Sequence, residues 1–404
     1  MSIKLSEKSA LIPPSPIRKL APYAHAAMQK GINVYKLNIG QPDIGMPECA
    51  LNAIRAAKIN NLPYTNSAGT PSYIEALADY YSKRGHQILP HELVVTNGGS
   101  EAIYFALLAI CNPGDEVIIP EPYYANYNGF TIQVGAKIVP ITTHIEDGFA
   151  LPNIEEFEKI ISPRTKAIMI CNPNNPTGKL YSAQEINQLK EIAIKHDIFL
   201  IADEVYSDFC YDDEKHTSLL ELDGIDDRVI ICDSVSKRYS MCGARVGAII
   251  SKNADIMDVV MRLAQTRLSA PFLDLLAAEA ALRCTDEHYF ETVKTEYISR
   301  RDTMIKLLRE IDGVVCPTPK GAFYVVAKLP VDNSEKFSQW MLEKFSLNNE
   351  TLMLAPAAGF YADPNKCPQN YVRLAYVLCV EDIKKSMNIL KHALDAYNKE
   401  NSNN

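Results

Sequence analysis

Long apolar runs and an excess of positive charge are both missing from this 404-residue chain. No apolar stretch approaches the roughly 20 residues of a membrane-spanning helix, and the N-terminus lacks the apolar core of a signal peptide. The 41 Lys and Arg residues stand against 49 Asp and Glu residues, so the formal net charge is −8 at pH 7. This balance argues against a nucleic-acid scaffold. We therefore expect a soluble protein with neither a membrane nor a nucleic acid as its partner.

Paired cysteine motifs are also absent, although the chain has ten cysteines. No Cys-x-x-Cys occurs, which leaves zinc binding and dithiol redox chemistry without support. We expect reduced thiols, no metal site and a cytoplasmic location. A Gly-x-Gly-x-x-Gly sequence after the first strand is missing too, which argues against a nicotinamide-dependent enzyme.

Seven short apolar runs alternate with helical segments between about residues 48 and 280. This alternation predicts an α/β fold with a mainly parallel sheet flanked by helices on both faces. Ligands of such folds bind at the carboxyl ends of the strands. The expected strands are 93–96, 116–120, 137–141, 167–171, 198–202, 229–232 and 246–250.

The length leaves room for two domains. We expect a large domain at 46–284 and a smaller α/β domain at 285–404, whose polar last residues (398–404) fray. The N-terminal segment, 1–45, is predicted to pack with the small domain. Its prolines at 13, 14 and 16 predict an extended start rather than a helix.

The most specific signal is Ser-Val-Ser-Lys-Arg-Tyr-Ser-Met-Cys-Gly-Ala-Arg-Val-Gly, which begins at Ser234. Lys237 follows Ser234 and Ser236, and Arg245 comes eight residues after the lysine. A lysine can hold an aldehyde as a Schiff base while hydroxyls and a guanidinium neutralise a phosphate. The pattern predicts covalent binding of a phosphorylated aldehyde. Taken alone, a surface lysine in a Ser/Gly-rich turn explains it about equally well.

A second anion-binding pattern is Thr-Asn-Gly-Gly-Ser-Glu, between an expected strand and an expected helix. Gly98 and Gly99 allow the backbone to approach an anion, and Ser100 lies where the helix offers free N–H groups. A plain strand-to-helix turn with a capping side chain is the simpler alternative, and both can hold together.

Polar residues after the next strands fit a pyridine ring. In Asn-Pro-Asn-Asn-Pro-Thr-Gly, we expect the Asn175 amide to donate to the ring oxygen O3′. Asp203, at a strand end, is predicted to pair with the ring nitrogen and make the ring an electron sink. Tyr206, three residues on, would lie on the same helical face and donate to O3′. The alternative is that Asp203 only caps a helix.

Three further residues complete the expected cavity. Tyr124, in Pro-Tyr-Tyr, is a candidate for stacking on the ring, although core packing is the commoner role of such a tyrosine. Arg373 lies within the apolar strand 371–375 with no local partner, which favours a bidentate contact with a substrate carboxylate over a structural salt bridge. Gly40, in Asn-Ile-Gly-Gln-Pro-Asp, would leave room for the substrate.

In their order these motifs resemble the class I aminotransferases of fold type I, the aspartate aminotransferase superfamily, over nearly the whole chain. The resemblance implies pyridoxal 5′-phosphate as cofactor and a ping-pong reaction between an L-amino acid and a 2-oxo acid. It implies a homodimer with shared active sites, in which Tyr64 reaches the phosphate of the other subunit. Carried over to matching positions, it implies three groups of residues. They are catalytic Lys237, Asp203 and Tyr206; further cofactor contacts at Gly98, Gly99, Ser100, Tyr124, Asn175, Ser234, Ser236, Arg245 and Tyr64; and substrate contacts at Gly40, Asn175, Arg373 and Arg267.

Substrate choice is where this chain departs from part of the family. Some aspartate-specific relatives have a lysine where this chain has Ser100 and Glu101. Arg267 is the candidate for binding a distal carboxylate, with Arg18 and Lys19 as weaker ones. We expect aspartate or glutamate with 2-oxoglutarate. Alanine or aromatic amino acids, a β-lyase reaction on the same fold, and a non-catalytic binding module are the alternatives.

Overall fold

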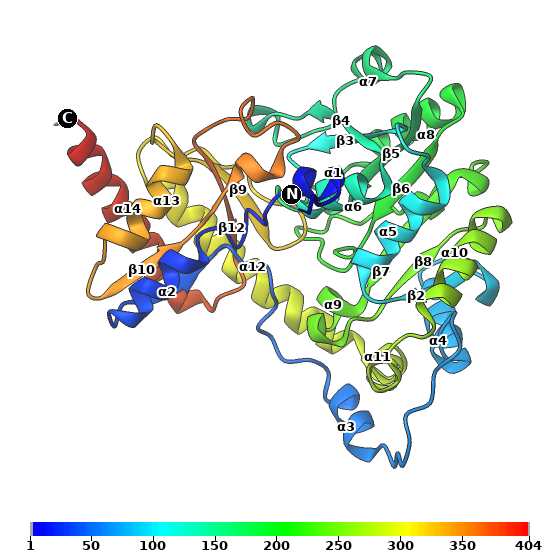
Figure 1. Ribbon diagram of the computed structural model, residues 1–404. Helices are drawn as coiled ribbons and strands as arrows, with labels where there is room; N and C mark the ends of the chain where they lie inside the picture. Colours follow the sequence, from blue (N-terminus) through cyan, green and yellow to red (C-terminus); the bar gives the residue numbers. More distant parts are fainter. Residues whose placement is uncertain (1–2, 403–404) are drawn as a thin grey trace.

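A computed structural model describes residues 3–402 of the chain (Figure 1). Its largest sheet has seven strands in the order β2-β8-β7-β6-β5-β3-β4. Strand β8 is antiparallel to both neighbours, and all other pairs are parallel. This confirms the predicted fold, and each expected strand is present with its ends shifted by at most two residues. The strands are β2 (Leu93–Thr96), β3 (Glu116–Glu121), β4 (Lys137–Thr142), β5 (Thr165–Cys171), β6 (Phe199–Asp203), β7 (Val229–Ser234) and β8 (Gly247–Ile250).

Helices cover both faces of this sheet, which explains why its strands are apolar throughout. Successive residues of β5 point to opposite faces: Met169 belongs to one buried apolar cluster and Ile168 to another. Helices α5 and α10 contribute side chains to the first cluster, and α4, α8 and α11 contribute side chains to the second. The helices of this region are α3 (Glu48–Ala56), α4 (Pro71–Ser82), α5 (Gly99–Ile110), α6 (Asn126–Val134), α7 (Ile154–Ile160), α8 (Ala183–His196), α9 (Val235–Arg238), α10 (Ala254–Arg267) and α11 (Phe272–Cys284).

Two smaller sheets lie in the left half of Figure 1, away from the seven-stranded sheet, and the long helix α12 (Glu287–Arg309) runs between the two halves. One is antiparallel, in the order β11-β12-β9, and the other pairs β1 with β10 in parallel. The N-terminal segment thus packs against late parts of the chain. The domain bounds given above stay a prediction. The elements are α2 (Ala21–Gln29), β1 (Asn33–Lys36), β9 (Tyr324–Lys328), α13 (Ser334–Lys344), β10 (Glu350–Met353), β11 (Ala355–Pro356), β12 (Tyr371–Ala375) and α14 (Val380–Ser402).

Both ends of the chain differ from expectation. The N-terminus is not extended throughout, because a short helix, α1 (Glu7–Leu11), precedes the prolines; a proline restrains only itself and the residue before it. At the other end α14 is helical through Ser402, since Asn398 and Tyr397 anchor it to Pro330 O and Asp332. The expected fraying at 403–404 lies outside the described residues. Within residues 3–402, no helix has the length and apolar character needed to cross a membrane.

Candidate active site

A cavity of about 510 Å³ lies at the carboxyl ends of β5, β6 and β7. Parallel strands deliver the residues that follow them to one edge of the sheet, which brings together segments far apart in sequence. Twelve of the residues selected from the sequence line this cavity. They are Gly40, Gly99, Ser100, Tyr124, Asn175, Asp203, Tyr206, Ser234, Ser236, Lys237, Arg245 and Arg373.

One end of the cavity has the chemistry of an anion site. Gly98 precedes helix α5 with a φ of 76°, which favours glycine, and a Cβ there would lie 2.5 Å from Arg245 Nη2, so the guanidinium packs directly against this residue. The Arg245 guanidinium is held by the carbonyls of Cys242 and Asn97, at 2.9 and 3.3 Å. Ser234 and Ser236, whose hydroxyls lie 2.7 Å apart, line the cavity as well. A helix N-terminus, hydroxyls and a guanidinium together suit a phosphate.

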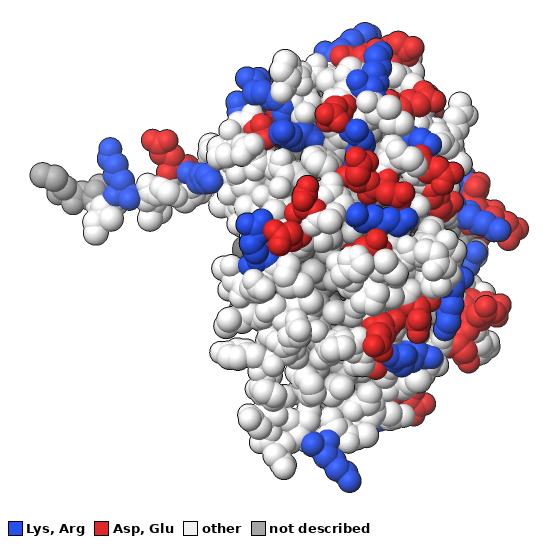
Figure 2. Space-filling view, turned by 90° about the vertical axis from the view of Figure 1, so that its right-hand side faces the viewer, with Lys and Arg blue, Asp and Glu red and all other residues white. Residues whose placement is uncertain are grey.

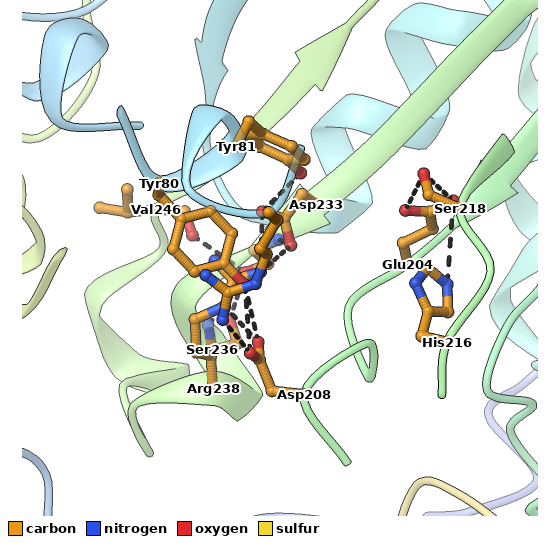
Figure 3. Close-up of polar contacts among 12 residues, drawn as sticks. Tyr80, Tyr81, Glu204, Asp208, His216, Ser218, Asp233, Ser236, Arg238 and Val246 are labelled. Atoms are coloured by element: carbon orange, nitrogen blue, oxygen red, sulfur yellow. Dashed lines mark hydrogen bonds and ion pairs between the residues drawn. The ribbon is translucent and has the colours of Figure 1, made fainter. Parts of the chain in front are cut away.

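Lys237 lies in the one-turn helix α9 and is half-buried, so it is not the surface lysine of the alternative interpretation. Its Nζ donates to the Gly40 carbonyl at 2.9 Å and lies 3.6 Å from Cys242 Sγ. Neither contact neutralises the amine. On the other side of α9, the buried Arg238 binds Asp233 and Asp208 (Figure 3).

Asp203 is the last residue of β6 and is 4% exposed. Its Oδ2 accepts a hydrogen bond from Tyr127 at 2.6 Å, and its Oδ1 has no hydrogen-bond partner among residues 3–402. Burial raises the pKa of Asp203 to about 6, against the opposing effect of the Tyr127 hydrogen bond. A buried carboxylate oxygen without a partner is costly unless a ligand supplies a donor. The capping alternative is wrong, because a turn and not a helix follows β6.

Tyr206 reaches the cavity by a route that the sequence analysis did not foresee. The predicted shared helical face with Asp203 is wrong, since residues 205–208 form a turn. Its hydroxyl lies 2.9 Å from that of Tyr324 and 3.5 Å from Asn175 Nδ2. The turn thus brings Tyr206 beside Asn175, as expected, by a different local structure.

Arg373, in β12, is 1% exposed. Its Nη1 donates to Asn175 Oδ1 at 3.2 Å, Nη2 donates to the Asn38 carbonyl, and Nε has no hydrogen-bond partner within the described part of the chain. Neither acceptor is a carboxylate, so the structural salt bridge is excluded for these contacts. Burial lowers the pKa of the guanidinium, which an incoming carboxylate would offset.

Two tyrosines of the site were not selected from the sequence. Tyr127, three residues after Tyr124, donates to Asp203, and Tyr324 lines the cavity. The expected role of Gly40 also changes: a Cβ there would lie 1.9 Å from the Tyr324 hydroxyl. The glycine makes room for this tyrosine, which the sequence analysis did not single out.

Three candidates lie outside the cavity of their own chain. Gly98 packs against the Arg245 guanidinium. Tyr64 is 79% exposed and lies on the segment before α4. Arg267 is not the exposed helix-end residue of the simpler reading, because its side chain is 11% exposed. It donates to the Ser67 and Val95 carbonyls and lies 3.7 Å from Glu101. Of the two weaker candidates, Arg18 lines the cavity, whereas Lys19 pairs with Glu335.

The match to a protein family decides the assignment. Residues 32–366 match the family described as aminotransferase class I and II. The chain belongs to this family. It is 31% identical to an aspartate aminotransferase of Pyrococcus abyssi, over 96% of this chain and 98% of that one. It is 29% identical to aromatic-amino-acid aminotransferase 2 of Thermococcus litoralis, over 96% of this chain and 98% of that one. An alanine aminotransferase structure from Pyrococcus furiosus superposes with a TM-score of 0.88 at 29% identity, covering 97% of this chain and all of that one.

Membership confirms the aminotransferase resemblance and the fold, which is fold type I of the pyridoxal phosphate enzymes. Members of the family use pyridoxal phosphate. The residues present fit this group: the unpartnered Asp203 Oδ1 suits a ring N–H, and the anion end suits a phosphate. Among the matched aminotransferases the named amino acid differs, so membership alone does not select the substrate.

Proposed function

We propose that this aminotransferase uses Lys237, Asp203 and Tyr206 as its catalytic residues. The proposal is carried by one observation. Asp203, whose Oδ1 has no partner, and Lys237 line the same cavity as the anion site formed by Ser234, Ser236 and Arg245. Pyridoxal phosphate has a ring nitrogen for the first, an aldehyde for the second and a phosphate for the third. No other cavity-lining carboxylate competes for that role in the described structure.

The remaining cofactor contacts follow from the same arrangement. When bound, pyridoxal phosphate supplies a ring that withdraws electrons from the substrate's α-carbon. Asp203 keeps the ring nitrogen protonated, Asn175 and Tyr206 donate to the ring oxygen, and Tyr124 packs against the ring. The phosphate contacts are Gly98, Gly99, Ser100, Ser234, Ser236 and Arg245, with Tyr64 of the partner subunit.

The chain's own residues then handle the substrate. Arg373 binds the α-carboxylate with its guanidinium, beside Asn175 and Gly40. Lys237 Nζ removes the proton from the α-carbon and returns a proton when a 2-oxo acid runs the second half of the reaction. In the described structure the amine contacts the Gly40 carbonyl and Cys242 Sγ, neither of which is a carboxylate.

We propose aspartate or glutamate as amino donor and 2-oxoglutarate as acceptor. The aspartate aminotransferase relatives support this choice, as does Arg18, which lines the cavity in addition to Arg245 and Arg373. A distal carboxylate would bind Arg18, or Arg267 of the partner subunit. Alanine and aromatic amino acids are the alternative donors, since they need no second cation.

A single half-reaction tests the proposal. L-Amino acids are added one at a time to the protein loaded with pyridoxal phosphate, and pyridoxamine phosphate, 2-oxo acid and ammonia are measured. Stoichiometric conversion by aspartate and glutamate is the expected result. Conversion by alanine or tyrosine but not by aspartate would contradict the proposal of a dicarboxylate amino donor. Continuous ammonia release would indicate a lyase. Arg18→Gln and Arg267→Gln, each compared for aspartate against alanine, identify the distal contact.

We also propose a homodimer with shared sites in the cytoplasm. Large exposed apolar side chains on α3, the segment after it and the end of α10 support the dimer: Ile54, Leu62, Tyr64 and Leu268. Charged side chains are sparse in the lower left part of the face in Figure 2, whereas they gather on its right. The ten cysteines, none of them in a disulfide, support a reducing compartment. Sedimentation equilibrium tests the dimer.

A further inference from the structure

Tyr324, the first residue of β9, is a cavity-lining phenol that none of the proposed roles uses. It is 2% exposed. Its hydroxyl lies 2.9 Å from that of Tyr206 and 3.4 Å from the Gly40 carbonyl oxygen. Packing alone would be served by a phenylalanine, whereas a buried hydroxyl has to find hydrogen-bond partners. The Tyr324 hydroxyl therefore belongs to the hydrogen bonding of the site.

The direction of the bond between the two tyrosines follows from counting hydrogens. Each phenol has one hydrogen to donate and lone pairs that accept. If Tyr206 donates to the cofactor's ring oxygen, only Tyr324 has a hydrogen left for their 2.9 Å contact. Asn175 Nδ2, at 3.5 Å, is a weak donor at best. Tyr324 must then donate to Tyr206.

The other acceptor near Tyr324 does not change this conclusion. The Gly40 carbonyl lies 3.4 Å from the Tyr324 hydroxyl, at the edge of hydrogen-bonding range. The shorter contact, with Tyr206, is the better one for the single hydrogen.

We propose that Tyr324 is a positioning residue, whose hydroxyl donates to Tyr206 and so strengthens and aims the hydrogen bond from Tyr206 to the cofactor. The inference rests on the proposed role of Tyr206. Hydrogen bonds in a chain polarise one another by about 10–30% per bond. Without the Tyr324 hydroxyl, Tyr206 is a weaker hydrogen-bond donor, so the cofactor's ring oxygen holds negative charge less readily. The proton that lies beside this ring oxygen is then lost only at higher pH.

Tyr324→Phe tests this with little change in packing. The Arg373 guanidinium lies 4.6 Å from the Tyr324 ring centre, and a phenylalanine ring keeps that contact. The visible absorbance of the protein loaded with pyridoxal phosphate is titrated with pH. We expect its midpoint to rise by about 0.3–1 pH unit and kcat to fall by about 3- to 10-fold, with KM changed by less than about 2-fold.

Tyr376→Phe is the matched control. Tyr376 is fully buried, and its hydroxyl donates to the Ala322 carbonyl at 3.2 Å, away from the cavity. It should leave the absorbance midpoint unchanged. Thermal unfolding of both variants without cofactor checks that each folds. Equal midpoint shifts in the two variants would overturn the inference.

Tyr206→Phe separates this inference from the proposed function. If Tyr206→Phe moves the midpoint and Tyr324→Phe does not, the inference is overturned and the proposed role of Tyr206 stands. If neither moves it, the proposed role of Tyr206 fails. In the double variant we expect the shift of Tyr206→Phe alone, since Tyr324 acts through Tyr206. Additive shifts would show that Tyr324 acts by another path.

Discussion

Arg238 donates from Nη2 to both carboxylate oxygens of Asp233, at 2.9 and 3.1 Å, and each residue is 2% exposed. Its Nε donates to Asp208, which also accepts from Arg84 at 2.7 Å. Two cations and two anions thus balance within one cluster (Figure 3 labels three of them). Because Arg238 directly follows Lys237 in α9, the ion pairs of Arg238 hold the short helix that carries the lysine.

Removing Arg238 should destabilise the protein strongly. Arg238→Met leaves the buried Asp233 without its cation and leaves Asp208 with Arg84 alone, and breaking a buried ion pair typically costs about 3–5 kcal/mol. Urea unfolding of the cofactor-free protein measures the change. Arg84→Met is the control: Arg84 binds the same Asp208 but its side chain is 40% exposed, so we expect a loss below about 1 kcal/mol. Equal losses would show that burial does not set the strength of this cluster.

Adding Asp233→Asn to Arg238→Met distinguishes charge from shape. The second change removes one uncompensated carboxylate, so part of the lost stability should return. If the double variant is less stable than Arg238→Met alone, Asp233 is held mainly by its other contacts with Tyr81 and the Ser234 backbone N–H.

Glu204 gives the protein a pH-dependent stability. Burial raises its pKa to about 8, although hydrogen bonds from the Leu219 backbone and the Ser218 hydroxyl lower it (Figure 3). Below pH 4.5 the carboxyl is protonated whether the chain is folded or unfolded. Between pH 4.5 and about 8 only the folded chain keeps the proton, so stability falls as pH rises through this window.

Glu204→Gln should remove this dependence, because the amide does not titrate. Between pH 5 and 9 we expect the wild type to lose on the order of 4 kcal/mol more unfolding free energy than the variant. Denaturant unfolding at a series of pH values measures both profiles. Parallel profiles would mean that Glu204 is ionised throughout this range.

The sequence predicted the residues whose signal is local. The strand bounds followed from apolar runs, Lys237 from its flanking serines, and Arg373 from a charge within an apolar strand. Tyr127 and Tyr324 carried no such signal, because their partners lie 76 and 118 residues away in the chain. Tyr206 was selected through a helix that does not form. Only the folded sheet edge shows which tyrosine meets which carboxylate or hydroxyl.

Cofactor affinity should depend on the ionisation of Asp203. Its pKa of about 6 means that the carboxyl becomes neutral as pH falls through 6, and it then no longer attracts a protonated ring nitrogen. Asp203→Asn should weaken binding of pyridoxal phosphate by about 10- to 100-fold at pH 7.5 and much less at pH 5. Equilibrium dialysis of the cofactor-free proteins measures this. A constant ratio across pH would contradict a charge pair at this position.

Tyr127→Phe is a useful companion to that variant. It removes the hydroxyl that donates to Asp203 Oδ2 at 2.6 Å and keeps the ring. Since this hydrogen bond lowers the carboxyl's pKa, its loss should move the pH dependence of cofactor binding upward. An unchanged midpoint would mean that a water replaces the hydroxyl.

Subunit mixing tests whether the active sites are shared. Tyr64 is 79% exposed, and a side chain so placed can serve only another subunit's cavity if it binds phosphate at all. Lys237→Ala and Tyr64→Ala dimers should each have low activity. In a mixed dimer, one site has both defects and the other has neither. Mixing after mild dissociation should therefore restore activity, up to about one quarter of the wild-type value if pairing is random and half of all dimers are mixed. If activity does not rise although mixed dimers are detected, each Tyr64 acts within its own chain or not at the phosphate.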